Sequence, residues 1–293
     1  MALFRGVATA ITTPFDKKGI DWVALRQQIE WQIDSGVEAI VVLGTTGESS
    51  TVSNEERAKL IAMSVDIVAG RVPVIVGTGS NDTAKAIFYS QQAEVLGADG
   101  LLIVTPYYNK CTQNGLIAHY TKIALKVGLP IILYNVPSRT NVNILPKTLG
   151  RLANIDNIVA IKDASGDLLQ MQEYCNVAKD LDIYCGDDAL IIPYFAQSAK
   201  GVISVLSNIL PKEMVAIGNL CKNNDFERAR DAYSAVFFVN KAMLTEVNPI
   251  GVKTAMQLLG RDSGILRPPL GKMSRSHTMK LKRALEQYWE SLE

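Results

Sequence analysis

Lys162 is the residue of this sequence best suited to covalent chemistry. It ends a run of β-branched and small apolar residues that begins at Ile158 (IVAIK), a pattern typical of a strand buried on both faces of a parallel sheet. Because side chains alternate along a strand, we expect Lys162 to share a face with Ala160 and Ile158 while Asp163 points the other way. Burial would disfavour the ammonium and leave an amine that can form an imine with a carbonyl substrate. The strand alone does not exclude a lysine that extends to water or pairs with a distant carboxylate.

The segment Gly44–Ser49 (GTTGES) follows another apolar run and is rich in hydrogen-bond donors. Glycine lets the backbone approach a ligand closely, and the hydroxyls of Thr45 and Thr46 can donate to a carboxylate. A tight turn in which Thr46 or Ser49 caps the next helix explains the segment equally well.

Two more apolar runs are followed by residues that could act on a substrate. Tyr134 ends the run before the one that carries Lys162, so its hydroxyl could relay protons, and Arg139 on the next loop is suited to bind a substrate carboxylate. Tyr107 and Tyr108 follow an earlier run, where surface packing or a subunit contact is the simpler explanation.

These residues would be positioned by a repeating pattern of short apolar runs separated by segments of helical length. Eight runs begin 19 to 35 residues apart, at Val7 (within the strand candidate Gly6–Thr12), Ala39, Val74, Leu101, Ile131, Val159, Ile183 and Val202. This spacing is that of successive βα units and predicts an α/β protein with a closed (β/α)₈ barrel. A Rossmann-type sheet is disfavoured because no GxGxxG follows the first run. The candidate residues all follow a strand, which is where barrel active sites lie.

Gly186, Asp187 and Asp188 follow the seventh run. Many barrels bind phosphate near this position, and two acids there argue against a phosphorylated substrate or a cofactor such as pyridoxal phosphate. An imine-forming lysine without that cofactor indicates chemistry of the class I aldolase type. We expect no cofactor and no metal.

The last part of the chain reads as helices over Pro211–Lys222, Asp225–Leu244, Pro249–Gly260 and Ser274–Leu292. We predict a catalytic barrel over residues 1–207 and a C-terminal helical region over residues 208–293. No low-complexity linker separates them, so we expect the helical region to pack on the barrel.

The composition excludes several classes of protein. Of the 293 residues 48% are hydrophobic and 20% charged, with 30 Lys and Arg against 29 Asp and Glu, so neither disorder nor a nucleic-acid or membrane surface is indicated. The four cysteines form no CxxC pair, and the N-terminus is too polar for a secretory signal. We expect a cytoplasmic protein with reduced thiols and a small-molecule partner.

Four motifs carry a specific resemblance: GTTGES at 44–49, TPYYN at 105–109, YNVPSRT at 134–140 and IKDASG at 161–166. Together they resemble the dihydrodipicolinate synthase family of pyruvate-dependent aldolases, over the whole chain. The resemblance implies condensation of pyruvate with L-aspartate 4-semialdehyde to 4-hydroxy-tetrahydrodipicolinate, in lysine and diaminopimelate biosynthesis. It also implies a homotetramer built from tight dimers.

The resemblance assigns a catalytic role to four residues. Lys162 would form the Schiff base, and Tyr134 would move protons through Thr46 to a Tyr108 donated by a neighbouring subunit.

Substrate-binding roles are implied in the same way. Thr45 and Thr46 would hold the pyruvate carboxylate, and the backbone carbonyls of Gly186 and Ile203 would flank the site. Arg139 would bind the carboxylate of the second substrate.

Two alternatives remain. A sister aldolase, such as N-acetylneuraminate lyase or a 2-keto-3-deoxy sugar acid aldolase, acts on a polyol chain that offers Arg139 no anion, and burying an unpaired guanidinium is unfavourable. A small-molecule-binding regulator on an inactive barrel would be expected to have lost Lys162 or Tyr134, and both are present.

Relatives inhibited by L-lysine have an effector pocket at the dimer interface, whose matching positions here are Ser49, Ser50, Asn54, Arg57, Asn81, Lys85 and Tyr107. The inhibited pattern has a glutamate at the position of Lys85 and commonly histidines at those of Asn54 and Arg57. Because Lys85 and Arg57 would repel a cationic effector, we predict an enzyme insensitive to lysine.

Overall fold

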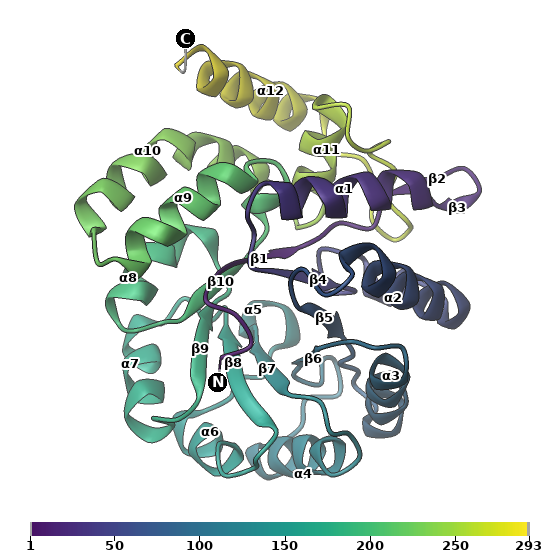
Figure 1. The fold of residues 1–293 in the computed structure, drawn as a ribbon, viewed down its shortest axis with the longest axis vertical. Coiled ribbons are helices and arrows are strands. Elements are labelled where there is room, and N and C mark those ends of the chain that lie inside the picture. The colour runs from purple at the N-terminus through teal and green to yellow at the C-terminus, as the bar shows by residue number, and fades with distance from the viewer. Residues whose placement is uncertain (1, 292–293) are drawn as a thin grey trace.

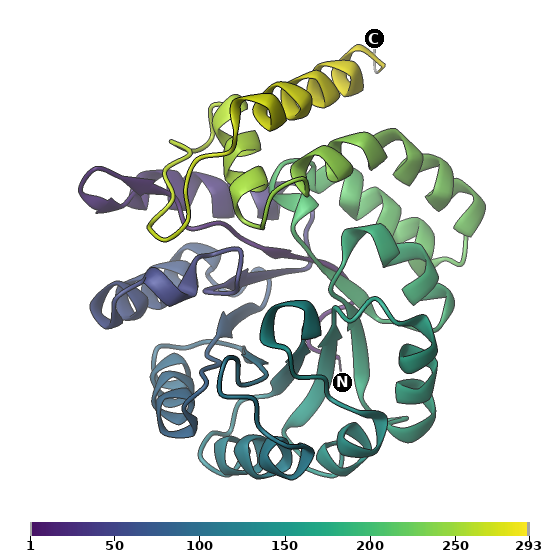
Figure 2. The ribbon, with the colours of Figure 1, turned by 180° about the vertical axis from the view of Figure 1, so that it is seen from behind.

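The computed structural model describes residues 2–291, and its centre is a closed ring of eight parallel strands surrounded by helices (Figures 1 and 2). The predicted (β/α)₈ barrel is therefore confirmed. The strands pair in the order β1-β10-β9-β8-β7-β6-β5-β4, and β4 closes the ring on β1. Their bounds are β1 Gly6–Ala10, β4 Ala39–Val42, β5 Val74–Gly77, β6 Gly100–Val104, β7 Ile131–Asn135, β8 Ile158–Asp163, β9 Asp182–Cys185 and β10 Gly201–Ser204.

Helices follow the strands around the ring, and two very short strands form a hairpin before the first helix. The hairpin comprises β2 Phe15–Asp16 and β3 Gly19–Ile20. The helices are α1 Trp22–Asp34, α2 Asn54–Val68, α3 Thr83–Val95, α4 Gln113–Ala124, α5 Pro137–Thr140, α6 Pro146–Leu152, α7 Leu168–Val177 and α8 Ile191–Ala196, with 3₁₀ turns η1 Ser49–Thr51, η2 Asp188–Leu190 and η3 Leu206–Asn208.

The first helix shows how local sequence sets these bounds. Asp21 is the N-cap of α1, and its carboxylate accepts hydrogen bonds from the backbone N–H groups of Val23 and Ala24, which would otherwise lack partners. Aspartate is a preferred N-cap residue, so the local sequence explains where α1 begins.

Side chains of the barrel strands divide between two cores. Inward residues such as Ala8, Val41, Ile132 and Ile203 fill the barrel, and outward residues pack against the helices. Strands buried on both faces explain the near-continuous apolar runs in the sequence.

Strand β8 departs from the predicted alternation. The register with β7 shifts between Ile158 and Ala160, which pair with the consecutive residues Ile131 and Ile132. Ala160 belongs to the inner core, but Ile158 belongs to the outer one. The expectation that Ile158 shares a face with Lys162 was therefore wrong, because this β-bulge adds a residue to the strand.

The C-terminal helices are α9 Pro211–Lys222, α10 Phe226–Met243, α11 Ile250–Leu258 and α12 Arg275–Glu290. Helix α9 packs on β1, where a Cβ added at Gly218 would lie 2.8 Å from Val7 Cγ2. Helix α10 packs against α9 and α12, and α11 and α12 lie on the edge of the molecule that carries α1 (Figures 1 and 2). The predicted end of the last helix at Leu292 lies outside the described residues. Across residues 2–291, no helix has the length and apolar character needed to span a membrane.

Candidate active site

A cavity of about 240 Å³ opens at the carboxyl ends of the barrel strands. Its walls come from several strand ends and from the C-terminal region. The lining includes Gly44, Thr45, Thr46, Tyr134, Arg139, Lys162, Gly186, Asp187, Val205 and Asn248. The structure thus brings most of the predicted site residues together from distant parts of the chain.

Lys162 is buried in this cavity, with 5% of its surface exposed. Its Nζ lies 4.4 Å from the centre of the Tyr134 ring, and the two residues are register partners on β8 and β7. Among the described residues Lys162 takes part in no salt bridge, whereas the other buried lysine, Lys253, does. Lys162 is therefore a buried amine beside the ring of a tyrosine, inside a cavity large enough for a small substrate.

Asp163 points away from Lys162, as the pleat predicted. Its carboxylate accepts hydrogen bonds from Asn135 Nδ2 at 2.9 Å, Tyr194 Oη at 2.6 Å and Ser165 Oγ at 2.8 Å. Burial raises the pKa of Asp163, although these donors oppose the shift. The network fixes the end of β8 and leaves Lys162 without a counter-ion.

The loop after β4 presents Thr45 and Thr46 to the cavity. It is held by Glu48, which adopts a left-handed backbone conformation with φ of 52° and is 3% exposed. Lys253 Nζ donates to Glu48 Oε1 and to the carbonyl of Thr13, both at 2.8 Å. A buried ion pair therefore anchors the loop to the C-terminal region.

Asn248 is a site residue that sequence reasoning missed. Its Nδ2 donates to Thr46 Oγ1 at 2.9 Å, and its backbone carbonyl accepts from Arg139 Nη2 at 3.0 Å. The Asn248 side chain leaves the Thr46 hydroxyl proton free to donate elsewhere. The only local signal was its position just before a predicted helix.

Arg139, on the short helix α5, lines the cavity but is exposed. The sequence argument assumed the unfavourable burial of an unpaired guanidinium, and that premise was wrong because the cavity is open at this edge. Arg139 provides a cation at the cavity mouth, whose guanidinium bonds within residues 2–291 only to the backbone carbonyl of Asn248.

Gly186 lines the cavity where no side chain would fit, because a Cβ there would lie 2.7 Å from Ala164 Cβ and 2.9 Å from the carbonyl oxygen of Asp163. The buried Asp188 accepts from the backbone N–H groups of Val205 and Leu206 at 2.9 and 2.8 Å, and burial raises its pKa. Ile203 lies in the inner core just below the cavity, and Val205 lines the cavity after it.

Tyr108 does not reach the cavity of its own chain. It is 90% exposed, with a left-handed φ of 72°, and lies on the loop after β6. The structure of one chain therefore brings Lys162, Tyr134 and Thr46 together and leaves Tyr108 outside.

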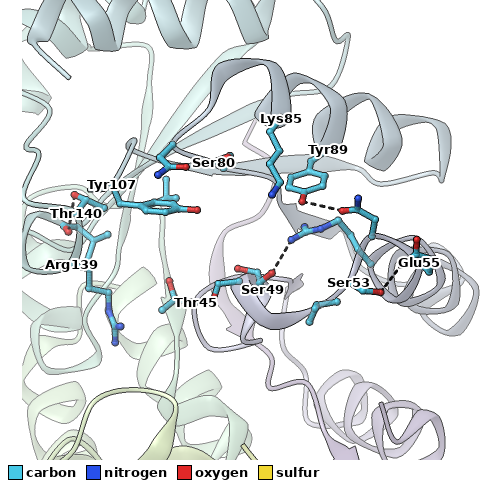
Figure 3. Close-up of a pocket in the computed structure, with 18 residues that line it drawn as sticks. Thr45, Ser49, Ser53, Glu55, Ser80, Lys85, Tyr89, Tyr107, Arg139 and Thr140 are labelled. Carbon is cyan, nitrogen blue, oxygen red and sulfur yellow. Dashed lines mark hydrogen bonds between the residues drawn. The ribbon is translucent and has the colours of Figure 1, made fainter. Parts of the chain in front are cut away.

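A second, larger cavity of about 670 Å³ lies beside the first and shares Thr45, Val136 and Arg139 with it. Figure 3 shows Arg139 at one end, and Lys85 and Tyr89 at the other. All seven positions predicted for the effector pocket line this cavity.

The described residues contain no cluster of three or more potential metal-ligating side chains. The cavity instead offers an amine, a phenol, two threonine hydroxyls and an arginine. Fold and site together define a barrel enzyme whose lysine is placed to react with a carbonyl group.

Comparisons with known proteins agree with this fold and class of enzyme. The model of the dihydrodipicolinate synthetase family matches residues 3–288. The 4-hydroxy-tetrahydrodipicolinate synthases of Thermoanaerobacter sp. (strain X514) and Methanocaldococcus jannaschii are 47% and 49% identical, covering 98% and 97% of this chain and 98% of each relative. The solved dihydrodipicolinate synthase of Acinetobacter baumannii complexed with pyruvate is 41% identical, with a TM-score of 0.95 and coverage of 97% and 99%.

The chain belongs to the dihydrodipicolinate synthetase family. It is a lyase of lysine and diaminopimelate biosynthesis.

Proposed function

We propose that this enzyme condenses pyruvate with L-aspartate 4-semialdehyde to give 4-hydroxy-tetrahydrodipicolinate, through a Schiff base on Lys162. The observation that carries the proposal is the buried, unpaired Lys162 beside Tyr134 in a cavity at the strand ends. The names of the relatives and the pyruvate complex of the A. baumannii enzyme support it.

The chemistry requires a fixed sequence of proton transfers. The Lys162 amine attacks the keto carbon of pyruvate, and loss of water leaves an imine. Removal of a methyl proton gives an enamine, whose carbon attacks the aldehyde of the second substrate. The amino group of that substrate then displaces Lys162 from the former keto carbon and closes the ring. We propose that Tyr134 and Thr46 carry these protons, since both line the cavity.

The carboxylates of the two substrates would bind at different places. Thr45 and Thr46, which line the same cavity as Gly186, would donate to the pyruvate carboxylate. Arg139 at the cavity mouth would bind the carboxylate of aspartate semialdehyde through charge-assisted hydrogen bonds. This cation favours a carboxylated aldehyde over the polyol chain of N-acetylneuraminate or a 2-keto-3-deoxy sugar acid.

Borohydride trapping tests the proposal. Pyruvate with borohydride should add three carbons to Lys162 alone, as located by peptide mass spectrometry, and Lys162→Ala should give no adduct. An adduct on another residue would overturn the assignment. A coupled assay with aspartate semialdehyde, run beside N-acetylneuraminate, identifies the second substrate.

The exposed tyrosine pair supports a proposed assembly. Tyr107 and Tyr108 are 38% and 90% exposed on one loop, as expected if Tyr108 completes the proton relay of a neighbouring subunit in a homotetramer of tight dimers. Sedimentation of the active enzyme should show no monomer, and a fully active monomer would contradict this role. All four cysteines are free, which fits the cytoplasmic location that we propose.

We also propose that L-lysine does not inhibit this enzyme. Arg57 and Lys85 line the larger cavity, and the ammonium groups of lysine would meet these two cations. Titrating L-lysine to millimolar levels in the coupled assay should leave the rate unchanged. Saturable inhibition would show that the two cations do not exclude the effector.

A further inference from the structure

The end of the larger cavity opposite Arg139 contains a cation without an anionic partner. Arg57 is only 4% exposed and forms no salt bridge among the described residues. A buried guanidinium normally pairs with a carboxylate, and burial here lowers the pKa of Arg57. The site therefore has a charge that a ligand could neutralise.

The Arg57 guanidinium is held in a fixed orientation. Its Nη1 donates to the carbonyl of Gly77 at 3.0 Å and its Nη2 to that of Ser49 at 3.1 Å. Its centre lies 4.1 Å from the centre of the Tyr89 ring, and Tyr89 is fixed in turn by a hydrogen bond to Asn54 Oδ1 at 3.1 Å. Nε is buried and has no partner. Three of the five N–H groups have no partner among the described residues, and the two of these on Nη1 and Nη2 could form an end-on fork with a carboxylate.

A second cation lies close to the first. Lys85, on α3, extends into the cavity on the Tyr89 side (Figure 3), and its Nζ lies 5.6 Å from the centre of the same ring. Lys85 also forms no salt bridge within residues 2–291. Glu55 is the one carboxylate of the lining; it is exposed and accepts from Ser53 Oγ at 2.8 Å. The two cations therefore face the cavity with little compensation.

We propose that this end of the cavity is a binding site for a small organic carboxylate that bears no ammonium group. One carboxylate would accept from Arg57 and Lys85 together, and the hydroxyls of Ser49 and Ser80 and the ring of Tyr107 would contact the rest of the ligand. A planar carboxylate fits the guanidinium fork better than a spherical anion does. The inference rests on the proposal that the pocket excludes L-lysine, since both use the same two cations.

Calorimetric titration with succinate tests the site. Succinate should bind the wild-type enzyme and bind at least tenfold more weakly to Lys85→Met, whose exposed position makes misfolding no concern. Arg57→Gln should show a similar loss. Lys122→Met, at an exposed lysine on α4 remote from the cavity, should bind as the wild type does.

Equal binding by Lys85→Met and wild type would overturn the site. Inorganic phosphate or chloride binding as tightly as succinate would overturn the choice of a carboxylate. Borohydride trapping and L-lysine inhibition are measured on the same preparations. If no pyruvate adduct forms, or if L-lysine does inhibit the enzyme, the result counts against the proposed function. If succinate alone does not bind, the result counts only against this inference.

Discussion

The enzyme buries two lysines against aromatic rings, and among the described residues only one of the two is paired with a carboxylate. Lys253 is fully buried, 4.3 Å from the centre of the Phe15 ring, and paired with Glu48 at 2.8 Å. Lys162 is 5% exposed and 4.4 Å from the centre of the Tyr134 ring, with no salt bridge in the described structure. Burial against an aromatic ring therefore does not mark a reactive lysine. What distinguishes the two lysines in the described structure is the counter-ion.

The presence or absence of a counter-ion should determine how much each lysine contributes to the stability of the fold. A buried ion pair stabilises little, but removing one partner leaves the other charge buried and unpaired. Burial lowers the pKa of Lys253 even though Glu48 and Asp262 oppose the shift. Lys162 lacks such a partner, so its side chain is free to form a covalent bond with a substrate.

Replacing Lys162 should have the largest effect on activity and little effect on stability. Lys162→Met should lower the turnover number at least about 10³-fold, because the proposed nucleophile is lost. The free energy of unfolding should stay within about 1 kcal/mol of the wild type or rise, because a buried polar group without a partner is removed. The coupled assay and a urea titration measure the two effects. A large loss of stability would show that Lys162 has an ionic partner after all.

The matching substitution at Lys253 should have the opposite outcome. Lys253→Met should lower the free energy of unfolding by about 3–5 kcal/mol, because Glu48 becomes a buried, unpaired carboxylate. Adding Glu48→Gln should restore much of this stability, since neither member of the former ion pair then carries a charge. Urea unfolding of both variants measures the free energy of unfolding. Pyruvate trapping on Lys162 should persist under native conditions. If Lys253→Met is as stable as the wild type, the proposed difference between the two buried lysines is wrong.

Arg139 extends the comparison to an exposed cation. Arg139→Ala should raise the KM for aspartate semialdehyde about 10- to 100-fold, as expected for the loss of about 1.4–2.8 kcal/mol from a charge-assisted hydrogen bond. Pyruvate trapping should survive, because Lys162 is untouched. Arg151→Ala, at an exposed position on α6, is the control. If trapping fails as badly as turnover, Arg139 serves the first substrate.

His119 is a third buried base without an ionic partner, and it should have the smallest effect. It is 5% exposed, its Nδ1 lies 2.9 Å from Thr83 Oγ1, and burial lowers its pKa to about 4. Between the unfolded pKa of about 6.5 and this value the unfolded chain binds more protons, so stability falls as the pH is lowered. His119→Gln should reduce the loss between pH 7 and 5 by on the order of 1–2 kcal/mol. Thermal unfolding over this range measures it, and equal slopes would contradict it.

What the sequence could predict depended on how local each feature is. The eight strands and the outward turn of Asp163 follow from neighbouring residues, and the structure confirms them. The role of Lys253 depends on Glu48, 205 positions away, and that of Asn248 on Thr46, 202 positions away. The bulge that moves Ile158 outward depends on pairing with β7. Such features require the partner element and could not be inferred from the strand or helix alone.

The pair Glu48–Lys253 also has a consequence for synthesis of the chain. At about 5–20 residues per second, the ribosome adds Lys253 some 10–40 s after Glu48. During that interval the carboxylate has no ammonium beside it, and the loop that bears Thr45 and Thr46 lacks its anchor. Asn248 is added only shortly before Lys253. The strand-end cavity is therefore completed by the last sixth of the nascent chain, so a truncated translation product would carry Lys162 without a finished pocket.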